Sequence, residues 1–201
     1  MVNQPYIGFE GPIGAGKTTL AGLLAAHLNA TLILEDVDGN EFLADFYGNK
    51  QRWALGMQFS FLISRHEQLR TVVSPRNTAV VADYTQAKDA VFARTLLRDR
   101  EVRLYDRMSV GLRAGVIQPD VIVYLDAQDD VLLDRIRHRS RSYEASIDSN
   151  YLDSLRDAYR RYLNQAGDLR VLHYDTSALD LASGSQLIDL YRKILAAASG
   201  G

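Results

Sequence analysis

Cysteine is absent from the 201-residue sequence. Disulfides, a thiol nucleophile and a cysteine-ligated zinc site are therefore excluded, and the absence fits a reducing compartment. The chain also lacks any run approaching the roughly 18 apolar residues of a membrane-spanning helix, and its start does not resemble a signal peptide. We therefore expect a soluble, cytoplasmic protein without a membrane partner.

An excess of charge of either sign is missing as well. The chain has 23 Lys and Arg residues against 25 Asp and Glu residues, a net charge of −2 at pH 7. This balance gives no global attraction for nucleic acid, so we expect no nucleic-acid partner. The length and the 47% hydrophobic content suit one α/β domain, and we expect residues 1–201 to form a single domain.

A glycine-rich segment near the start of the chain is the strongest motif. Residues 11–18 match the phosphate-binding pattern G-x-x-x-x-G-K-[ST], between an apolar run and a helix-like stretch. Backbone N–H groups of such a loop converge on a polyphosphate because glycine has no Cβ to block the approach. Lys17 should reach the β- and γ-phosphates, and the Thr18 hydroxyl should bind Mg²⁺. The expected ATP-binding residues are Gly11, Pro12, Ile13, Gly14, Ala15, Gly16, Lys17, Thr18 and Thr19.

Five short apolar runs alternate with helical patterns along the chain. The expected strands are Tyr6–Glu10, Thr31–Leu34, Ala79–Ala82, Asp120–Asp126 and Leu169–Tyr174. The expected helices are Thr19–Leu28, Glu41–Tyr47, Arg52–Val72, one or two within Lys88–Arg113 with a joint near Arg100, one that begins at Asp129, Tyr151–Gln165 and Gln186–Ala198. Such alternation predicts an α/β fold with a five-stranded parallel sheet and helices on both faces.

Acidic residues follow three of these predicted strands. Glu35, Asp83 and Asp126 should project toward the sheet edge that carries the glycine-rich loop, where ligands bind in such folds. A hydroxyl nucleophile needs a base and Mg²⁺ needs oxygen ligands, which makes Glu35 and Asp83 candidates, although acidic residues after strands also serve as helix caps. For Asp126 we favour a capping role because Asp129 and Asp130 follow it closely.

Polar residues at helical spacing supply further candidates. Residues 135–141 contain four arginines, which can stabilise charge on a transferring γ-phosphoryl group or can simply complement a helix dipole. Four guanidinium groups exceed what the dipole alone would select. Gln58 and Arg65 share a face of the long predicted helix and can pair with a nucleobase edge, although their spacing also fits exposed polar positions.

Several separate stretches together resemble the deoxynucleoside kinases, particularly the purine and cytidine branch. The stretches are Phe9–Leu20, Leu34–Val37, Phe42–Tyr47, Arg52–Trp53 with Gln58, Asp83, Asp89 with Phe92, the arginine-rich segment, Tyr143–Glu144 and Tyr151–Leu152. The resemblance implies a P-loop kinase core that uses ATP and Mg²⁺ to phosphorylate the 5′-hydroxyl of a deoxyribonucleoside in nucleotide salvage. It also implies a homodimer.

The resemblance further implies roles for individual residues. Glu35 should act as the general base for the 5′-hydroxyl, and Tyr47 and Glu144 should hold the 3′-hydroxyl of the sugar. The segment of about residues 135–146 should form a lid over the ATP phosphates. The remaining implied roles are base reading by Gln58, Arg65 and Asp89 with Phe92 near the base, lid cations at Arg135, Arg139 and Arg141, and an acidic residue near Mg²⁺ and the substrate at Asp83.

One position departs from the family pattern. The family usually has an arginine directly after the acidic residue of the third strand, near the reacting phosphate, but this chain has Tyr84. Either another cation takes over or transfer is weakened, and Lys88 is the nearest candidate. The donors of Arg65 with the acceptors of Asp89 suit a purine better than thymine, while the preferred base is left open.

Two other functions remain as alternatives. A nucleoside monophosphate kinase of the thymidylate kinase type has the same core, but its acceptor is already ionised and needs no base such as Glu35. A nucleotide-binding regulatory protein that does not catalyse would fit Tyr84, but the presence together of Lys17, Thr18 and Glu35 argues against it.

Overall fold

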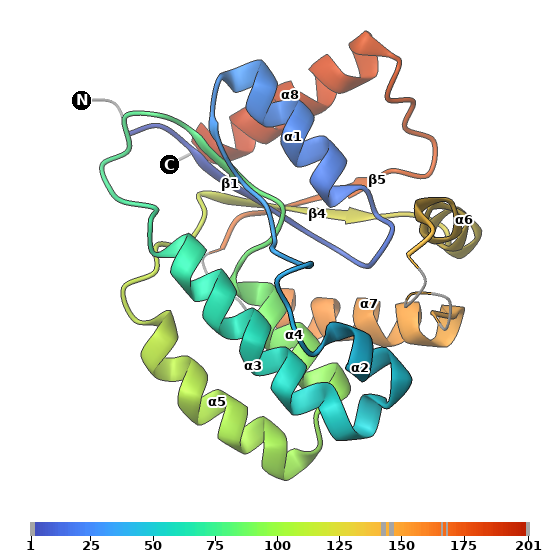
Figure 1. The fold of residues 1–201 in the computed structure, drawn as a ribbon. Coiled ribbons are helices and arrows are strands. Elements are labelled where there is room, and N and C mark those ends of the chain that lie inside the picture. The colour runs from blue at the N-terminus through green and yellow to red at the C-terminus, as the bar shows by residue number, and fades with distance from the viewer. Residues whose placement is uncertain (1–2, 142–143, 145–146, 166, 168, 200–201) are drawn as a thin grey trace.

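A central parallel sheet organises the computed structural model, which describes residues 3–141, 144, 147–165, 167 and 169–199 (Figure 1). Its strand order is β2-β3-β1-β4-β5, and every neighbouring pair is parallel. The strands are β1 Tyr6–Glu10, β2 Thr31–Ile33, β3 Val80–Ala82, β4 Val121–Asp126 and β5 Val171–Asp175. The five expected strands and their parallel arrangement are therefore confirmed.

Helices cover both faces of the sheet, as expected. Figure 1 shows α1 and α8 on one face, α3, α4, α5 and α7 on the other, and α6 beyond the carboxyl end of β4. The helices are α1 Lys17–Leu28, α2 Leu43–Gly48, α3 Lys50–Leu69, α4 Gln86–Leu96, α5 Asp99–Arg113, α6 Asp129–Arg139, α7 Ser149–Gln165 and α8 Gly184–Ser199. None of the helices within the described residues is long and apolar enough to cross a membrane.

Capping explains where the helix bounds differ from expectation. The long helix starts two residues early because the Asn49 side chain accepts a hydrogen bond from Arg52 N at 3.2 Å. The segment after β3 is two helices, and they meet at Leu97 and Arg98, slightly before the expected joint. There the Glu101 carboxylate accepts from Arg98 N at 3.0 Å and fixes the start of α5.

The main core lies between the sheet and the layer formed by α1 and α8. All five residues of β1 are buried, which is expected for a central strand with helices on both faces. Leu24 of α1 is 0% exposed in this core, whereas its neighbour Leu23 is 37% exposed. The packing of α1 fixes the position of the loop that precedes it.

Truncation of Leu24 should therefore destabilise the fold. We expect Leu24→Ala to lower the free energy of unfolding by about 2–5 kcal/mol, since it leaves a cavity beneath the sheet. Leu23→Ala is the matched control and should cost less than about 1 kcal/mol. Urea denaturation of both variants measures the difference, and equal losses would contradict this account of the core.

Candidate functional site

The loop between β1 and α1 requires glycine at specific positions. Gly11, Gly14 and Gly16 have φ values of 138°, 85° and 92°, where other residues are strained. A Cβ on Gly11 would lie 2.0 Å from the carbonyl oxygen of Leu125, and one on Gly14 would lie 2.7 Å from that of Leu132. The loop thus passes so close to neighbouring backbone that side chains cannot be accommodated there.

Polar contacts connect this loop to the adjacent strands. Lys17 Nζ donates to the carbonyl oxygens of Gly11 and Pro12 at 2.8 Å each. Thr18 Oγ1 donates to Asp83 Oδ2 at 2.6 Å, and the other oxygen of Asp83 accepts from Glu35 N at 2.8 Å. Asp83, which follows β3, therefore joins the start of α1 to the end of β2.

Glu35 is a buried carboxylate held by two cations. Its Oε1 accepts from Arg65 Nε at 2.8 Å and from Arg65 Nη2 at 2.6 Å, while its Oε2 accepts from Lys88 Nζ at 2.6 Å. Burial by itself would raise the pKa of Glu35, but the charges of Lys88 and Arg65 outweigh it and lower the pKa to about 2. Glu35 is therefore ionised at neutral pH.

Arg65 connects Glu35 with a second buried carboxylate. Arg65 Nη1 donates to Asp89 Oδ1 at 2.5 Å, and Asp89 is 3% exposed. The guanidinium carbon of Arg65 lies 4.7 Å from the ring centre of Phe61 and 6.0 Å from that of Tyr84. One arginine of α3 thus fixes the end of β2 and the first turns of α4.

Gln58 lies about two turns before Arg65 on the same face of α3 and is 1% exposed. Its Nε2 donates to Met57 Sδ at 3.5 Å, and its Oε1 has no hydrogen-bond partner among the described residues. A buried amide with unused capacity in a cavity wall is suited to a polar ligand.

The arginine-rich segment divides into two sets of contacts. Arg135 donates to Thr176 Oγ1 at 2.9 Å and to Thr176 O at 2.7 Å, and lies 3.4 Å from Gly14 O. Arg139 Nη2 donates to both carboxylate oxygens of Glu144, at 2.7 and 2.6 Å, and Arg141 Nη1 lies 3.7 Å from Glu144 Oε1. Residues 142–143 and 145–146 of the expected lid, including Tyr143, lie outside the described residues.

A single cleft of about 920 Å³ brings nearly all of the predicted site residues together. The residues that line it extend from the glycine-rich loop, past Glu35, to α3 and α4. The predicted residues that border it are Ile13, Gly14, Ala15, Gly16, Lys17, Thr18, Thr19, Glu35, Tyr47, Gln58, Arg65, Asp83, Phe92, Arg135, Arg139, Arg141 and Glu144. Gly11 and Pro12 contribute carbonyls to Lys17 instead, and Asp89 lies behind Arg65.

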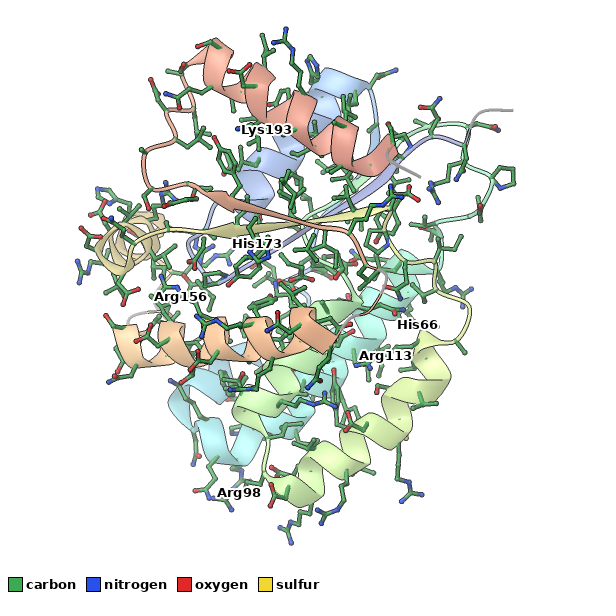
Figure 2. The ribbon with its side chains drawn as sticks, turned by 180° about the vertical axis from the view of Figure 1, so that it is seen from behind. His66, Arg98, Arg113, Arg156, His173 and Lys193 are labelled. Carbon is green, nitrogen blue, oxygen red and sulfur yellow. The ribbon has the colours of Figure 1, made fainter. Side chains whose placement is uncertain are left out.

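The expected capping role of Asp126 is wrong. The N-cap of α6 is Gln128, and the Asp126 carboxylate instead pairs with Arg156 Nε at 3.0 Å. Arg156 and His173, labelled in Figure 2, border a separate shallow cleft with Asp126. Thr176 was missed, although its position directly after β5 places it at the same sheet edge as the loop.

Comparison with known proteins identifies relatives over most of the chain. The family model "Deoxynucleoside kinase" matches residues 7–194. The deoxyguanosine kinase of Bacillus subtilis (strain 168) is 33% identical over 187 residues, which cover 90% of each chain. The deoxyadenosine kinase of Dictyostelium discoideum is 34% identical over 163 residues, 79% of this chain and 66% of the relative.

Solved structures show the same fold. The structure of deoxyadenosine kinase from M. mycoides with bound dCTP superimposes with a TM-score of 0.80 and 22% identity, covering 94% of this chain and 98% of that one. The structure of the same enzyme with bound dATP also gives a TM-score of 0.80. The fold is therefore that of a P-loop kinase.

The geometry of the loop predicts that Gly14→Ala impairs nucleotide binding. The added Cβ would clash with the backbone of α6 and strain a positive φ, so we expect affinity for ATP to fall at least about tenfold, or about 1.4 kcal/mol. Gly22→Ala is the control because a Cβ there meets nothing within 4 Å. It should leave affinity unchanged and raise stability by up to about 1 kcal/mol. Isothermal titration calorimetry tests both, and undiminished binding by Gly14→Ala would contradict the prediction.

The ion pairs of Glu35 predict a pH-dependent contribution to stability. Its folded pKa of about 2 lies below the ordinary value of about 4.3, so its stabilisation is present above pH 4.3 and is lost as pH falls toward 2. Glu35→Gln should therefore be most destabilised at neutral pH, and the deficit should shrink as the pH falls from about 5 toward 2. Glu67→Gln, at an exposed position of α3, should show little deficit at any pH. Urea denaturation across this range measures both, and a constant Glu35→Gln deficit would refute the pairing.

Proposed function

Because this chain belongs to the deoxynucleoside kinase family, we propose that it transfers the γ-phosphoryl group of ATP to the 5′-hydroxyl of a purine deoxyribonucleoside. The acceptor would be deoxyadenosine or deoxyguanosine, the setting nucleotide salvage, and residues 1–201 one kinase domain. One observation carries the proposal: a single cleft contains the phosphate-binding loop at one end, buried polar side chains of α3 at the other, and Glu35 between them.

Glu35 is the proposed general base. The acceptor oxygen attacks the γ-phosphorus, the bond between that phosphorus and the β–γ bridging oxygen breaks, and ADP leaves with the bond electrons. The hydroxyl proton passes to the Glu35 carboxylate, which its two cations keep ionised. In a loose transition state the protein contributes mainly positioning and electrostatic stabilisation, so Glu35 would chiefly orient the hydroxyl and accept its proton as the new bond forms.

Thr18 and Asp83 are the proposed Mg²⁺ ligands. Their oxygens lie 2.6 Å apart at the end of the glycine-rich loop, and hard oxygen ligands are those that Mg²⁺ prefers. No group of three or more His, Cys, Asp or Glu side chains within the described residues is arranged to hold a metal. This fits an ion held largely by substrate phosphates and water, which would neutralise charge on the β- and γ-phosphates.

Cations around the loop are proposed to bind the phosphates. Lys17 already spans the loop through two carbonyl contacts, and burial followed by the charge of Lys88 lowers its pKa to about 7 in the free protein. Bound phosphate would favour its charged form. Arg135, Arg139 and Arg141 border the same cleft and would stabilise the transferring group.

The acceptor end suits a purine deoxyribonucleoside. Gln58 has an unused acceptor, and Arg65 borders the cleft beside it with Asp89 paired behind it, so we assign base reading to these three residues. Tyr47 and Glu144 border the cleft where the sugar 3′-hydroxyl would lie, and Phe92 would contact the base. The names of the relatives, deoxyguanosine kinase and deoxyadenosine kinase, support the same substrate class.

Two further proposals concern the oligomeric state and the cellular location of the protein. A homodimer fits the exposed apolar side chains of adjacent helices α3 and α5, which include Ile63, Leu104, Met108 and Val110. The cytoplasmic location expected from the sequence stays a prediction.

The activity itself is tested by measuring ADP release from ATP and Mg²⁺ with each of the four common deoxynucleosides. We expect turnover with deoxyadenosine or deoxyguanosine and a loss of about a hundredfold or more in kcat for Glu35→Gln, in line with general-base contributions. Glu67→Gln should retain wild-type kcat. Turnover only with a nucleoside monophosphate would mean that the acceptor is wrong, and nucleotide binding without turnover would indicate a regulatory protein.

A further inference from the structure

Lys88 is the buried cation of the cleft whose role the proposed mechanism leaves open. It is the third residue of α4, is 8% exposed, and borders the cleft between the glycine-rich loop and the acceptor end. Its Nζ lies 2.6 Å from Glu35 Oε2. Two structural costs attend this position: an ammonium group loses its hydration, and a positive charge in the first turn of a helix opposes the helix dipole.

Most hydrogen bonds to the neighbouring carboxylates come from groups other than Lys88. Glu35 accepts two hydrogen bonds from Arg65 at Oε1 and one from Lys88 at Oε2. Glu10, buried next to the loop, accepts from Thr85 N, Thr85 Oγ1 and Tyr159 OH at 2.7 Å each. A purely structural counter-ion would therefore be an expensive addition at this position.

Lys88 also has unused hydrogen-bonding capacity. A lysine ammonium carries three donors, and within the described part of the chain Nζ of Lys88 makes one hydrogen bond. The charge of Lys88 is also one cause of the lowered pKa of Lys17, second to burial, which places the two ammonium groups within electrostatic range. Both ammonium groups border one cleft, so an anion bound there would be attracted by both, in addition to the carboxylates that already face them.

Position 84 contributes no charge to this cleft. Tyr84 is 0% exposed, its ring stacks beside the guanidinium of Arg65, and its hydroxyl donates to the side chain of Gln68. Gln68 in turn donates to Leu34 O at 3.0 Å. Through Gln68, Tyr84 thus contacts the segment that follows β2 and does not act as a cation. The next cation along the chain that borders the cleft is Lys88.

We propose that Lys88 is a catalytic cation that donates hydrogen bonds to the γ-phosphoryl group as it moves from ATP to the deoxynucleoside. The inference depends on the proposed function. While the acceptor oxygen bonds to phosphorus and the bridging oxygen departs with ADP, Lys17 stabilises the donor phosphates and Lys88 stabilises the equatorial oxygens from the acceptor side. Lys88 stays protonated throughout, and the hydroxyl proton goes to Glu35.

Steady-state kinetics of Lys88→Met, Lys88→Arg and Lys193→Met test this. Removal of one charged donor from a developing charge should lower kcat of Lys88→Met by about 10²–10³-fold and change KM for either substrate by less than about threefold. Lys88→Arg should restore kcat to within about tenfold of wild type, since it keeps the charge. Lys193 lies exposed on α8, on the opposite face of the sheet (Figure 2), and its variant should match wild type. Should Lys88→Met not fold, Lys88→Gln takes its place.

A double variant separates direct catalysis from positioning of Glu35. Lys88 and Glu35 form an ion pair, so their effects on kcat are not expected to be additive. If Lys88 acts on the phosphoryl group, Lys88→Met should still lower kcat further, by about tenfold or more, in the Glu35→Gln background. No further loss in that background, or a kcat of Lys88→Met within about threefold of wild type, would overturn the inference while leaving the proposed function intact. A wild-type protein that phosphorylates no deoxynucleoside would overturn the proposed function itself.

Discussion

A buried carboxylate remains ionised only where cations or hydrogen-bond donors surround it, and otherwise it takes up a proton. Glu35 meets this condition between Arg65 and Lys88. Because Arg65 also pairs with Asp89, this set of charges connects the end of β2, the long helix α3 and the first turns of α4. Charge pairing among Glu35, Arg65, Lys88 and Asp89 therefore shapes the end of the cleft that lies against α3 and α4. Loss of one partner would leave an uncompensated charge in the interior.

The order of the strands determines which of these groups can meet. The loop after β1, Asp83 after β3 and Glu35 after β2 lie at the ends of three adjacent strands. Asp83 follows β3, the middle strand of the three. One of its carboxylate oxygens contacts Thr18 and the other contacts the backbone of Glu35, so it fixes the position of the glycine-rich loop relative to Glu35. Asp126 follows β4 on the other side of β1, where it pairs with Arg156 of α7 and takes no part in this contact.

The features that the sequence could predict are those with local causes. The glycine-rich loop, the strands and the acidic residues at strand ends follow from motif, periodicity and the common edge of a parallel sheet. The contact between Arg65 and Asp89 depends on how two helices pack, and that between Arg135 and Thr176 depends on how α6 packs against the segment after β5, which no local pattern records. Lys88 was a candidate for the missing arginine, yet its burial could not be anticipated, because a lysine in a first helical turn is usually exposed.

Glu144 contacts an arginine of the proposed phosphate site and lies where the sugar of the acceptor is proposed to bind. Its carboxylate, 6% exposed, accepts from Nε and Nη2 of Arg139, whereas Nη1 of Arg139 has no hydrogen bond within the described part of the chain and could face a phosphate oxygen. A carboxylate has about four acceptor sites, which leaves room for a sugar hydroxyl on the same group. Under the proposed function, a bound sugar and a phosphate-facing Arg139 are therefore compatible and mutually supportive. Such sharing would link acceptor binding to the position of Arg139, which would favour the nucleoside over water as the acceptor of the phosphoryl group.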